Sequence, residues 1–177
     1  MTKHILLIGF KNVGKSSVGK ELASQLGRNF VDLDEEVEKL FESQQGHKLT
    51  CRQIMLKIGQ NGFRQLEHKA LMVILASPAQ SIISLGGGTP TFEPNTELML
   101  PHDIIHVVAD KNIVYNRIML NGRPAFFSPD EHPLVSFDRM WEERSKIYEQ
   151  LTKNKVDNST SVKNAVAEVK KIINQPV

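Results

Sequence analysis

The strongest chemical signal in the sequence is a glycine-rich loop near the start of the chain. Residues 9–16 read GFKNVGKS and match the pattern G-x-x-x-x-G-K-[ST], which arises by chance in fewer than about one chain in a hundred of this length. In such a loop the glycines let backbone N–H groups point at phosphate oxygens, and the start of the following helix favours negative charge. We therefore expect Lys15 to reach the β- and γ-phosphates of a nucleotide and the Ser16 hydroxyl to bind Mg²⁺.

This loop identifies neither the acceptor nor the reaction, because GTPases, ATPases and small-molecule kinases all carry it. A chain of this size with a proline-rich, lid-like segment at 122–133 favours a kinase that acts on a small metabolite. The alternatives are a nucleotide-binding loop that has lost catalysis and an ordinary strand–turn–helix connection.

A pair of carboxylates follows the second expected strand. Asp32 and Asp34 lie at its carboxyl end, where open parallel sheets place their ligands, and their spacing directs both to the same side. One carboxylate near Mg²⁺ and one near an acceptor hydroxyl would serve phosphoryl transfer. The alternative is that Asp34 only caps the helix that follows.

Three further groups of residues with chemical potential come later in the chain. Arg64 and Glu67 stand three residues apart, residues 86–88 are three glycines after another expected strand, and Arg123 and Arg144 follow. Each group has a plain alternative: the first pair could be a surface ion pair, the glycines a turn, and the later arginines solvent-exposed side chains. Three successive glycines nevertheless indicate that something approaches the backbone closely.

Short apolar runs alternate with helix-length segments along the chain, a pattern typical of a parallel sheet covered by helices. The absence of a repeat or linker in 177 residues favours one domain, 1–177. The expected strands are His4–Ile8, Asn29–Asp32, Ser81–Leu85, Asp103–Val108 and Lys155–Asp157. The expected helices are Lys15–Leu26, Asn61–Ala76, Lys111–Asn121 and Ser161–Asn174, the last with an apolar stripe that packs on the sheet.

The composition excludes several other classes of protein. A formal net charge of +2 offers no strong field for nucleic acid or anionic lipid. The single cysteine, Cys51, cannot form an internal disulfide or a cysteine-based zinc site, and the six histidines lack metal-ligand spacing. No apolar run approaches the roughly 20 residues of a membrane span, and the first residues do not read as a signal segment. We therefore expect a cytoplasmic monomer whose partners are small molecules.

The order of the motifs carries more information than any one of them. The phosphate-binding loop, Asp-x-Asp, Phe-Arg-x-x-Glu, Gly-Gly-Gly, Arg-Pro and a late Arg-x-x-x-Tyr-Glu follow one another over residues 5–149, and this succession closely resembles the shikimate kinase family. The resemblance implies an α/β protein with a three-layer α/β/α P-loop kinase fold, a five-stranded parallel sheet and a mobile lid at about 122–133.

The resemblance also implies an activity. Members of this family transfer the γ-phosphate of ATP, with Mg²⁺, to the 3-hydroxyl of shikimate, on the route to chorismate and the aromatic amino acids. The alternatives are a related P-loop kinase of a gluconate-like metabolite or a nucleotide, and an ATP-binding module without catalysis. The arginine pair and the three glycines favour a ring acid over a nucleotide.

Each site residue takes its role from the same resemblance. The catalytic residues would be Lys15, Asp34 and Arg123, and Mg²⁺ would be bound by Ser16 directly and by Asp32 through water. The ATP-binding residues would be Asn12, Val13, Gly14, Lys15, Ser16, Ser17, Arg117, on which adenine packs, and Arg123. The shikimate-binding residues would be Asp34, Arg64, Gly86, Gly87, Gly88 and Arg144, with the carboxylate held by the two arginines.

The chain departs from the family pattern at several positions. Lys11 stands where small residues are common, and it either adds positive charge beside the acceptor or points into solvent, which we expect. Met55 stands near the place of an aromatic pocket wall, and Ala-Phe-Phe follows Pro124 in place of a leucine pair. None of these differences removes a proposed catalytic group, but they bear on the affinity for the substrate.

Overall fold

The computed structural model describes residues 2–120, 122–124 and 126–174. Within them, five parallel strands form one sheet in the order β2-β3-β1-β4-β5. The central strand β1 is paired on both sides, with Leu6 opposite Ile83 of β3 and Ile104 of β4. The strands are β1 (Ile5–Ile8), β2 (Asn29–Asp32), β3 (Ser81–Ser84), β4 (Asp103–Val108) and β5 (Lys155–Asp157).

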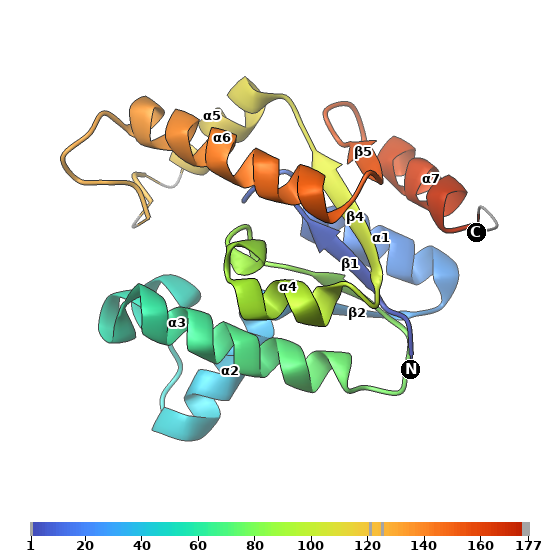
Figure 1. Cartoon of the computed structure of the whole chain (residues 1–177), viewed down its shortest axis with the longest axis horizontal. Helices are drawn as coiled ribbons and strands as arrows, with labels where there is room; N and C mark the ends of the chain where they lie inside the picture. Colours follow the sequence, from blue (N-terminus) through green and yellow to red (C-terminus); the bar gives the residue numbers. More distant parts are fainter. Residues whose placement is uncertain (1, 121, 125, 175–177) are drawn as a thin grey trace.

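Helices connect these strands and cover both faces of the sheet (Figure 1), since parallel neighbours can be joined only by crossovers. Helices α1 and α7 pack together on one face, α4 and α6 cross the other, and α2 and α3 lie side by side. This arrangement confirms the predicted α/β/α fold. The helices are α1 (Lys15–Leu26), α2 (Leu33–Gln45), α3 (Cys51–Leu75), α4 (Glu93–Met99), α5 (Lys111–Met119), α6 (Pro133–Leu151) and α7 (Val162–Ile173), with a 3₁₀ turn η1 (Thr89–Thr91).

The core lies between the sheet and its two helical layers. All four residues of β1 are buried, as expected for a strand that is covered on both faces. The apolar stripe of α7 (Ala165, Val166 and Val169) is buried too, which confirms its predicted packing on the sheet. The loops after β1, β2 and β3 leave the sheet at one edge, and the candidate residues therefore meet there. In the described part of the chain, no helix is long and apolar enough to cross a membrane.

The helix predicted at Asn61–Ala76 is longer than the sequence pattern indicates. Helix α3 begins at Cys51, behind a capping box in which Thr50 and Gln53 satisfy each other's backbone N–H groups. Gly59, with φ 74° and ψ 170°, interrupts the helical backbone. Two helical segments meet at this glycine, and the predicted helix covers only the second of them.

The remaining differences lie at the ends of elements. Ser161 and Asn174 flank α7 as caps and do not belong to it. Helix α4 and the turn η1 were not predicted, although each has a proline in its first turn, a known helix-start signal. Three other predicted segments miss by one or two residues: His4–Ile8 begins at Ile5, Ser81–Leu85 ends at Ser84, and Lys111–Asn121 ends at Met119, while Asn121 lies outside the described residues. Four match the structure at both ends: Lys15–Leu26, Asn29–Asp32, Asp103–Val108 and Lys155–Asp157.

Candidate active site

The loop between β1 and α1 has a sharply bent backbone. Gly9 has φ 137°, and a Cβ at this position would lie 2.2 Å from the carbonyl oxygen of Val107, so only glycine fits. Gly14 caps α1 with φ 97°, and Asn12 also takes a left-handed φ of 66°. The bend brings the loop to the N-terminus of α1, where backbone N–H groups and the helix dipole favour phosphate.

Lys15 holds its amine at the centre of this loop. Its Nζ donates hydrogen bonds to the carbonyl oxygens of Gly9 at 2.9 Å and Phe10 at 2.7 Å. Burial lowers the pKa of Lys15 to about 8, and the opposing charges of Asp34 and Asp32 limit the fall. Lys15 therefore carries a desolvated positive charge where the sequence predicts a phosphate contact.

Ser16 begins a small cluster of oxygen atoms beside Lys15. Its hydroxyl donates to Asp32 Oδ2 at 2.7 Å and lies 3.3 Å from the hydroxyl of Ser84. Hydroxyl and carboxylate oxygens are the ligands that Mg²⁺ prefers, and Mg²⁺ usually keeps several waters and phosphate oxygens in addition. This cluster therefore fits an ion that the protein holds by one or two oxygens, and among the described residues no group of three or more acidic, histidine or cysteine ligands is assembled.

Asp34 lies at the start of α2 and lines a cavity. It does not cap this helix, as one alternative held, because the cap is Asp32, which accepts a hydrogen bond from the backbone N–H of Asp34 at 3.1 Å. Although Asp34 is open to the cavity, desolvation by the surrounding protein raises the pKa of its carboxyl to about 6, and Asp32 and Glu67 add to this rise. The nearby Lys15 opposes it. Asp34 is thus an anion at neutral pH that takes up a proton readily.

Arg64 and Glu67 form a buried ion pair on α3. Their side chains are only 13% and 1% exposed, and Arg64 Nη1 lies 2.5 Å from Glu67 Oε2. The other oxygen of Glu67 accepts from the Thr89 hydroxyl at 2.7 Å. A Cβ on Gly88 would lie 2.1 Å from Arg64 Nη2, so glycine gives the guanidinium its space. The surface-pair alternative is wrong, and Glu67, absent from the predicted site residues, orients Arg64.

Arg144 reaches the same place from α6. Burial is the main cause that lowers the pKa of its guanidinium, and the positive charge of Arg64 adds to it. The neighbouring Tyr148 is fully buried and donates a hydrogen bond from its hydroxyl to the Gly87 carbonyl at 2.5 Å. Arg144 Nη1 would lie 3.5 Å from a Cβ on Gly87. The three-glycine loop and α6 are thus locked together with the guanidinium at their junction.

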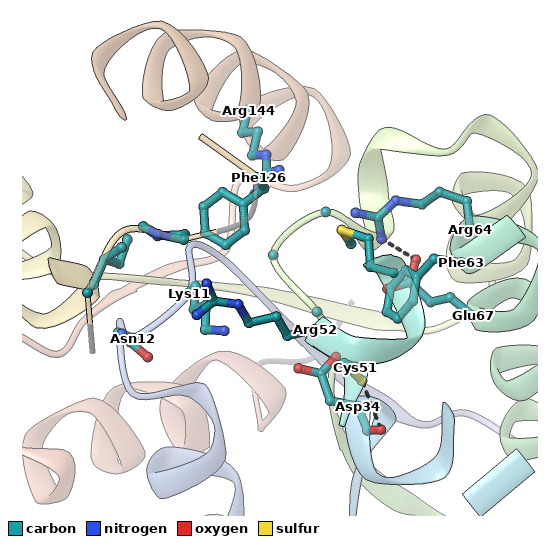
Figure 2. Close-up of a pocket in the computed structure, with 17 residues that line it drawn as sticks. Lys11, Asn12, Asp34, Cys51, Arg52, Phe63, Arg64, Glu67, Phe126 and Arg144 are labelled. Carbon is teal, nitrogen blue, oxygen red and sulfur yellow. Dashed lines mark hydrogen bonds and ion pairs between the residues drawn. The ribbon is translucent and has the colours of Figure 1, made fainter. Parts of the chain in front are cut away.

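A cavity of about 170 Å³ joins these residues beside the phosphate-binding loop. Figure 2 shows Arg64 and Arg144 extending from α3 and α6 toward the same space, with Asp34 on its floor. The structure therefore brings together in one cavity all the residues that the sequence predicts for the acceptor, including the glycines at 86–88. The sequence did not predict Cys51 and Arg52 as lining residues, because the helix on which they lie was not expected. Lys11 is exposed, as expected, and also lines the cavity.

The predicted adenine side is built around Arg117 of α5. Asn12 Nδ2 donates to the Arg117 carbonyl at 3.1 Å, and Arg117 Nη1 donates to the Asn12 carbonyl at 3.3 Å. Val13 is buried, and its carbonyl accepts from Asn158 Nδ2 at 2.8 Å. Ser17 is exposed on the first turn of α1. Arg117 thus lies against the loop, and Asn158 is a supporting residue that no sequence motif indicates.

Arg123, the third predicted catalytic residue, does not line the cavity. Its guanidinium donates to the carbonyl oxygens of Ser128 and Glu131 within its own segment, and its Nε is buried without a partner among the described residues. The described residues from 122 to 132 form no helix or strand, whereas Pro133, predicted as the last lid residue, already belongs to α6.

Comparison with known proteins assigns the site to a family. A family model described as shikimate kinase matches residues 11–174. Shikimate kinases of Phocaeicola vulgatus (34% identity, covering 75% of this chain and 74% of the relative) and Pelotomaculum thermopropionicum (32%, covering 94% and 93%) are similar in sequence. A shikimate kinase from Acinetobacter baumannii, solved in complex with shikimate, matches with a TM-score of 0.83 and 25% identity over 98% of this chain and 93% of that one.

A structural match outside this group is weaker. A gluconokinase from Sinorhizobium meliloti 1021 has a TM-score of 0.57 and 18% identity over 94% of this chain and 88% of that one. At this level of identity the likeness shows a shared fold alone. The comparisons therefore favour a shikimate kinase over the related metabolite kinase that the sequence analysis kept as an alternative.

Proposed function

The chain belongs to the shikimate kinase family and is an ATP-dependent shikimate kinase, and we propose the part that each residue takes in the transfer. One observation carries the proposal. Arg64 and Arg144 lie in one cavity with Asp34, next to the loop that carries Lys15. A small acid with ring hydroxyls finds in this cavity cations for its carboxylate and an acceptor for a hydroxyl.

Arg64 and Arg144 bind the carboxylate of shikimate. A planar guanidinium offers two parallel N–H donors to a carboxylate, and both guanidinium groups are largely buried, so the interaction is strong. Glu67 neutralises part of the positive charge and fixes the direction of Arg64. Gly86, Gly87 and Gly88 bring backbone close to the ring of the bound acid.

Asp34 orients the 3-hydroxyl and receives its proton. During the transfer the hydroxyl oxygen forms a bond to the γ-phosphorus, the bond from that phosphorus to the β–γ bridging oxygen breaks, and ADP leaves with the bridging oxygen. Asp34 is suited to take the proton, because its pKa of about 6 lies close to neutral pH. Phosphoryl transfer requires little covalent work from the protein, and positioning provides most of the acceleration.

Lys15 stabilises the negative charge on the transferring group, and the backbone N–H groups of the loop, including those of Val13 and Gly14, hold the β-phosphate. We propose Mg²⁺ as the cofactor, bound by Ser16 directly and by Asp32 through water. The hydrogen bond of 2.7 Å from the Ser16 hydroxyl to Asp32 Oδ2 supports this choice, because it places both oxygens together. Bound there, Mg²⁺ would neutralise charge on the phosphate oxygens. Ser17 is proposed as a further phosphate contact on the first turn of α1.

The adenine and lid contacts complete the ATP site. Arg117 is proposed to pack on adenine, and its reciprocal hydrogen bonds with Asn12 support this by placing it against the loop. Arg123 is proposed to contact the phosphates when its segment closes over the site, which would also exclude water. This closure requires its guanidinium to leave the carbonyls of Ser128 and Glu131.

We further propose that the enzyme is a monomer and that it acts in the cytoplasm, where ATP is abundant. The acceptor cavity supports the first proposal, since a single chain supplies Asp34, Arg64 and Arg144. Light scattering of the purified protein tests it.

A substrate panel tests the proposed activity. ADP release is measured with ATP and Mg²⁺ in the presence of shikimate, gluconate or a nucleoside monophosphate. We expect turnover on shikimate and at most traces on the other two. Turnover on gluconate or the nucleotide with none on shikimate would refute the assignment, and ATP binding without any turnover would favour an ATP-binding module.

A further inference from the structure

Two cationic side chains in the acceptor cavity have no part in the mechanism described so far. Lys11 extends from the phosphate-binding loop, and Arg52 extends from the first turn of α3 (Figure 2). Neither forms an ion pair with a carboxylate in the described part of the chain. Arg52 Nη2 donates to the backbone carbonyl of Arg123 at 3.4 Å, whereas Lys11 has no side-chain hydrogen bond to any described residue.

The cavity therefore holds more positive charge than a monocarboxylic acid needs. Its lining includes four cationic side chains but only two carboxylates, Asp34 and Glu67. Glu67 pairs with Arg64, and Arg144 is the second group on the acceptor carboxylate. Shikimate brings one negative charge, so the two carboxylates and the bound acid together still leave one of the four cationic side chains without an anionic partner. A phosphoryl group is the anion that this reaction delivers to the same cavity.

The backbone places Lys11 where the phosphoryl group must cross. A Cβ on Gly87 would lie 3.1 Å from the backbone N of Lys11, so the phosphate-binding loop and the three-glycine loop touch at this residue. Lys11 also comes directly after Gly9 and Phe10 in the chain, and the amine of Lys15 donates hydrogen bonds to the carbonyl oxygens of these two residues. Lys11 thus stands on the boundary between the nucleotide loop and the acceptor cavity.

Electrostatics agree with this position. Burial is the main cause that lowers the pKa of Lys15, and the charge of Lys11 adds to it. Burial raises the pKa of Asp34, and the charge of Lys11 opposes this rise. The amine of Lys11 is therefore close enough to act on both groups that flank the path of the phosphoryl group.

We propose that Lys11 is a further catalytic residue of this enzyme, which contacts the transferred phosphoryl group and binds it as the 3-phosphate of the product. The inference rests on the proposed function. Lys11 stays protonated throughout and forms no covalent bond, because its task is to attract a dianion that arrives on the acceptor oxygen. Shikimate itself carries only a neutral hydroxyl where the phosphoryl group will be attached. The affinity of the enzyme for shikimate therefore does not depend on Lys11.

Lys11→Met tests the proposal, with Lys11→Arg as the conservative variant and Lys20→Met as the matched control. Lys20 is an exposed lysine on α1 whose amine lies over the ring of Phe30, and its loss changes the net charge equally. Calorimetry measures the affinity of each protein for shikimate and for shikimate 3-phosphate, and a rapid-quench experiment measures the rate of a single turnover. Thermal melting verifies that all variants are folded.

We expect Lys11→Met to bind shikimate 3-phosphate about tenfold or more weakly and to slow the single turnover by a similar factor. Its affinity for shikimate stays within about twofold of the parent, Lys11→Arg recovers most of the product affinity, and Lys20→Met behaves as the parent. Three results would overturn the role of Lys11. They are an unchanged affinity of Lys11→Met for shikimate 3-phosphate, a loss of its affinity for shikimate as large as the loss for the product, and a loss of product affinity in Lys20→Met as large as in Lys11→Met. If the parent enzyme itself fails to phosphorylate shikimate, the proposed function is wrong, which is a separate result.

Discussion

The two halves of the active site are built in different ways. The phosphate-binding part of the nucleotide half is one continuous segment, residues 9–16, whose backbone bends around a single buried amine. The acceptor half is assembled from side chains on α2, α3 and α6 together with the loop after β3. The first half depends on local geometry, and the second depends on the packing of segments that are far apart in the sequence.

This difference determines how each half responds to change. In the nucleotide half the glycines set the turn, so a side chain can be removed while the loop keeps its shape. In the acceptor half Arg64 is held by Glu67, Glu67 by Thr89, and Gly88 leaves room for the guanidinium. A change at any member of this second group therefore disturbs the others.

Loss of Lys15 gives the largest expected effect and tests the nucleotide half. We expect Lys15→Ala to lower kcat by about a thousandfold or more, since a desolvated cation that faces developing charge is among the strongest single contributions to catalysis. The fold should persist, because the bent backbone does not depend on the amine. Steady-state ADP release and thermal melting measure the two effects, with Lys20→Ala as the control. Substantial activity in Lys15→Ala would show that another group neutralises the charge.

Loss of Arg64 tests the acceptor half. We expect Arg64→Ala to weaken shikimate binding by about 2–5 kcal/mol, because it removes one fork from the carboxylate and leaves Glu67 buried without its cation. The KM for shikimate should rise while the KM for ATP stays nearly constant. Adding Glu67→Gln to this variant should recover part of the thermal stability but none of the affinity for shikimate. This result separates the loss of a carboxylate donor from the effect of leaving Glu67 unpaired. A change confined to the KM for ATP would show that Arg64 acts in the nucleotide half and does not bind shikimate.

The sequence predicts the two halves unequally for the same reason. The nucleotide loop is visible as one pattern, and the structure gives it the predicted backbone. Arg64 and Arg144 could be grouped only through the order of motifs across the chain, since no local rule links α3 to α6. The supporting residues Thr89 and Asn158 could not be predicted because their hydrogen bonds join remote segments. The predicted helix omits the first turns of α3, because Gly59 interrupts the helical pattern between those turns and the rest of the helix.

A methyl group on Gly88 tests the acceptor half without any change in charge. The added Cβ would lie 2.1 Å from Arg64 Nη2, so the guanidinium must move away from the ring acid. We expect Gly88→Ala to raise the KM for shikimate about tenfold, the cost of a displaced charged hydrogen bond. The control is Gly62→Ala in the same region, where the nearest contact is the Ile58 side chain at 3.2 Å. Equal kinetics of the two variants would show that Arg64 adapts freely.

The pH dependence of the reaction involves one group from each half. Lys15 must be protonated and Asp34 ionised, and the pKa values are about 8 and about 6. We expect kcat/KM for shikimate to fall about tenfold per pH unit below pH 6, as Asp34 gains a proton, and again above pH 8, as Lys15 loses one. A flat acid limb down to pH 5 would exclude Asp34 as the group that receives the hydroxyl proton.

The smallest expected effect is on the free energy of unfolding, which the ionised carboxylate of Asp34 in the acceptor half lowers. A carboxyl whose pKa rises on folding stabilises the fold at low pH, where it is protonated, and loses this contribution as pH rises through about 6. Asp34 is open to the cavity, so solvent screens most of the effect, and the expected gain of Asp34→Asn is about 1 kcal/mol at pH 7. At pH 4 the gain should vanish, because both folded proteins then carry a neutral group at this position. Chemical denaturation at the two pH values measures this difference in the free energy of unfolding. If Asp34→Asn is less stable than the parent at pH 7, the attraction between Lys15 and Asp34 outweighs the desolvation of the carboxylate.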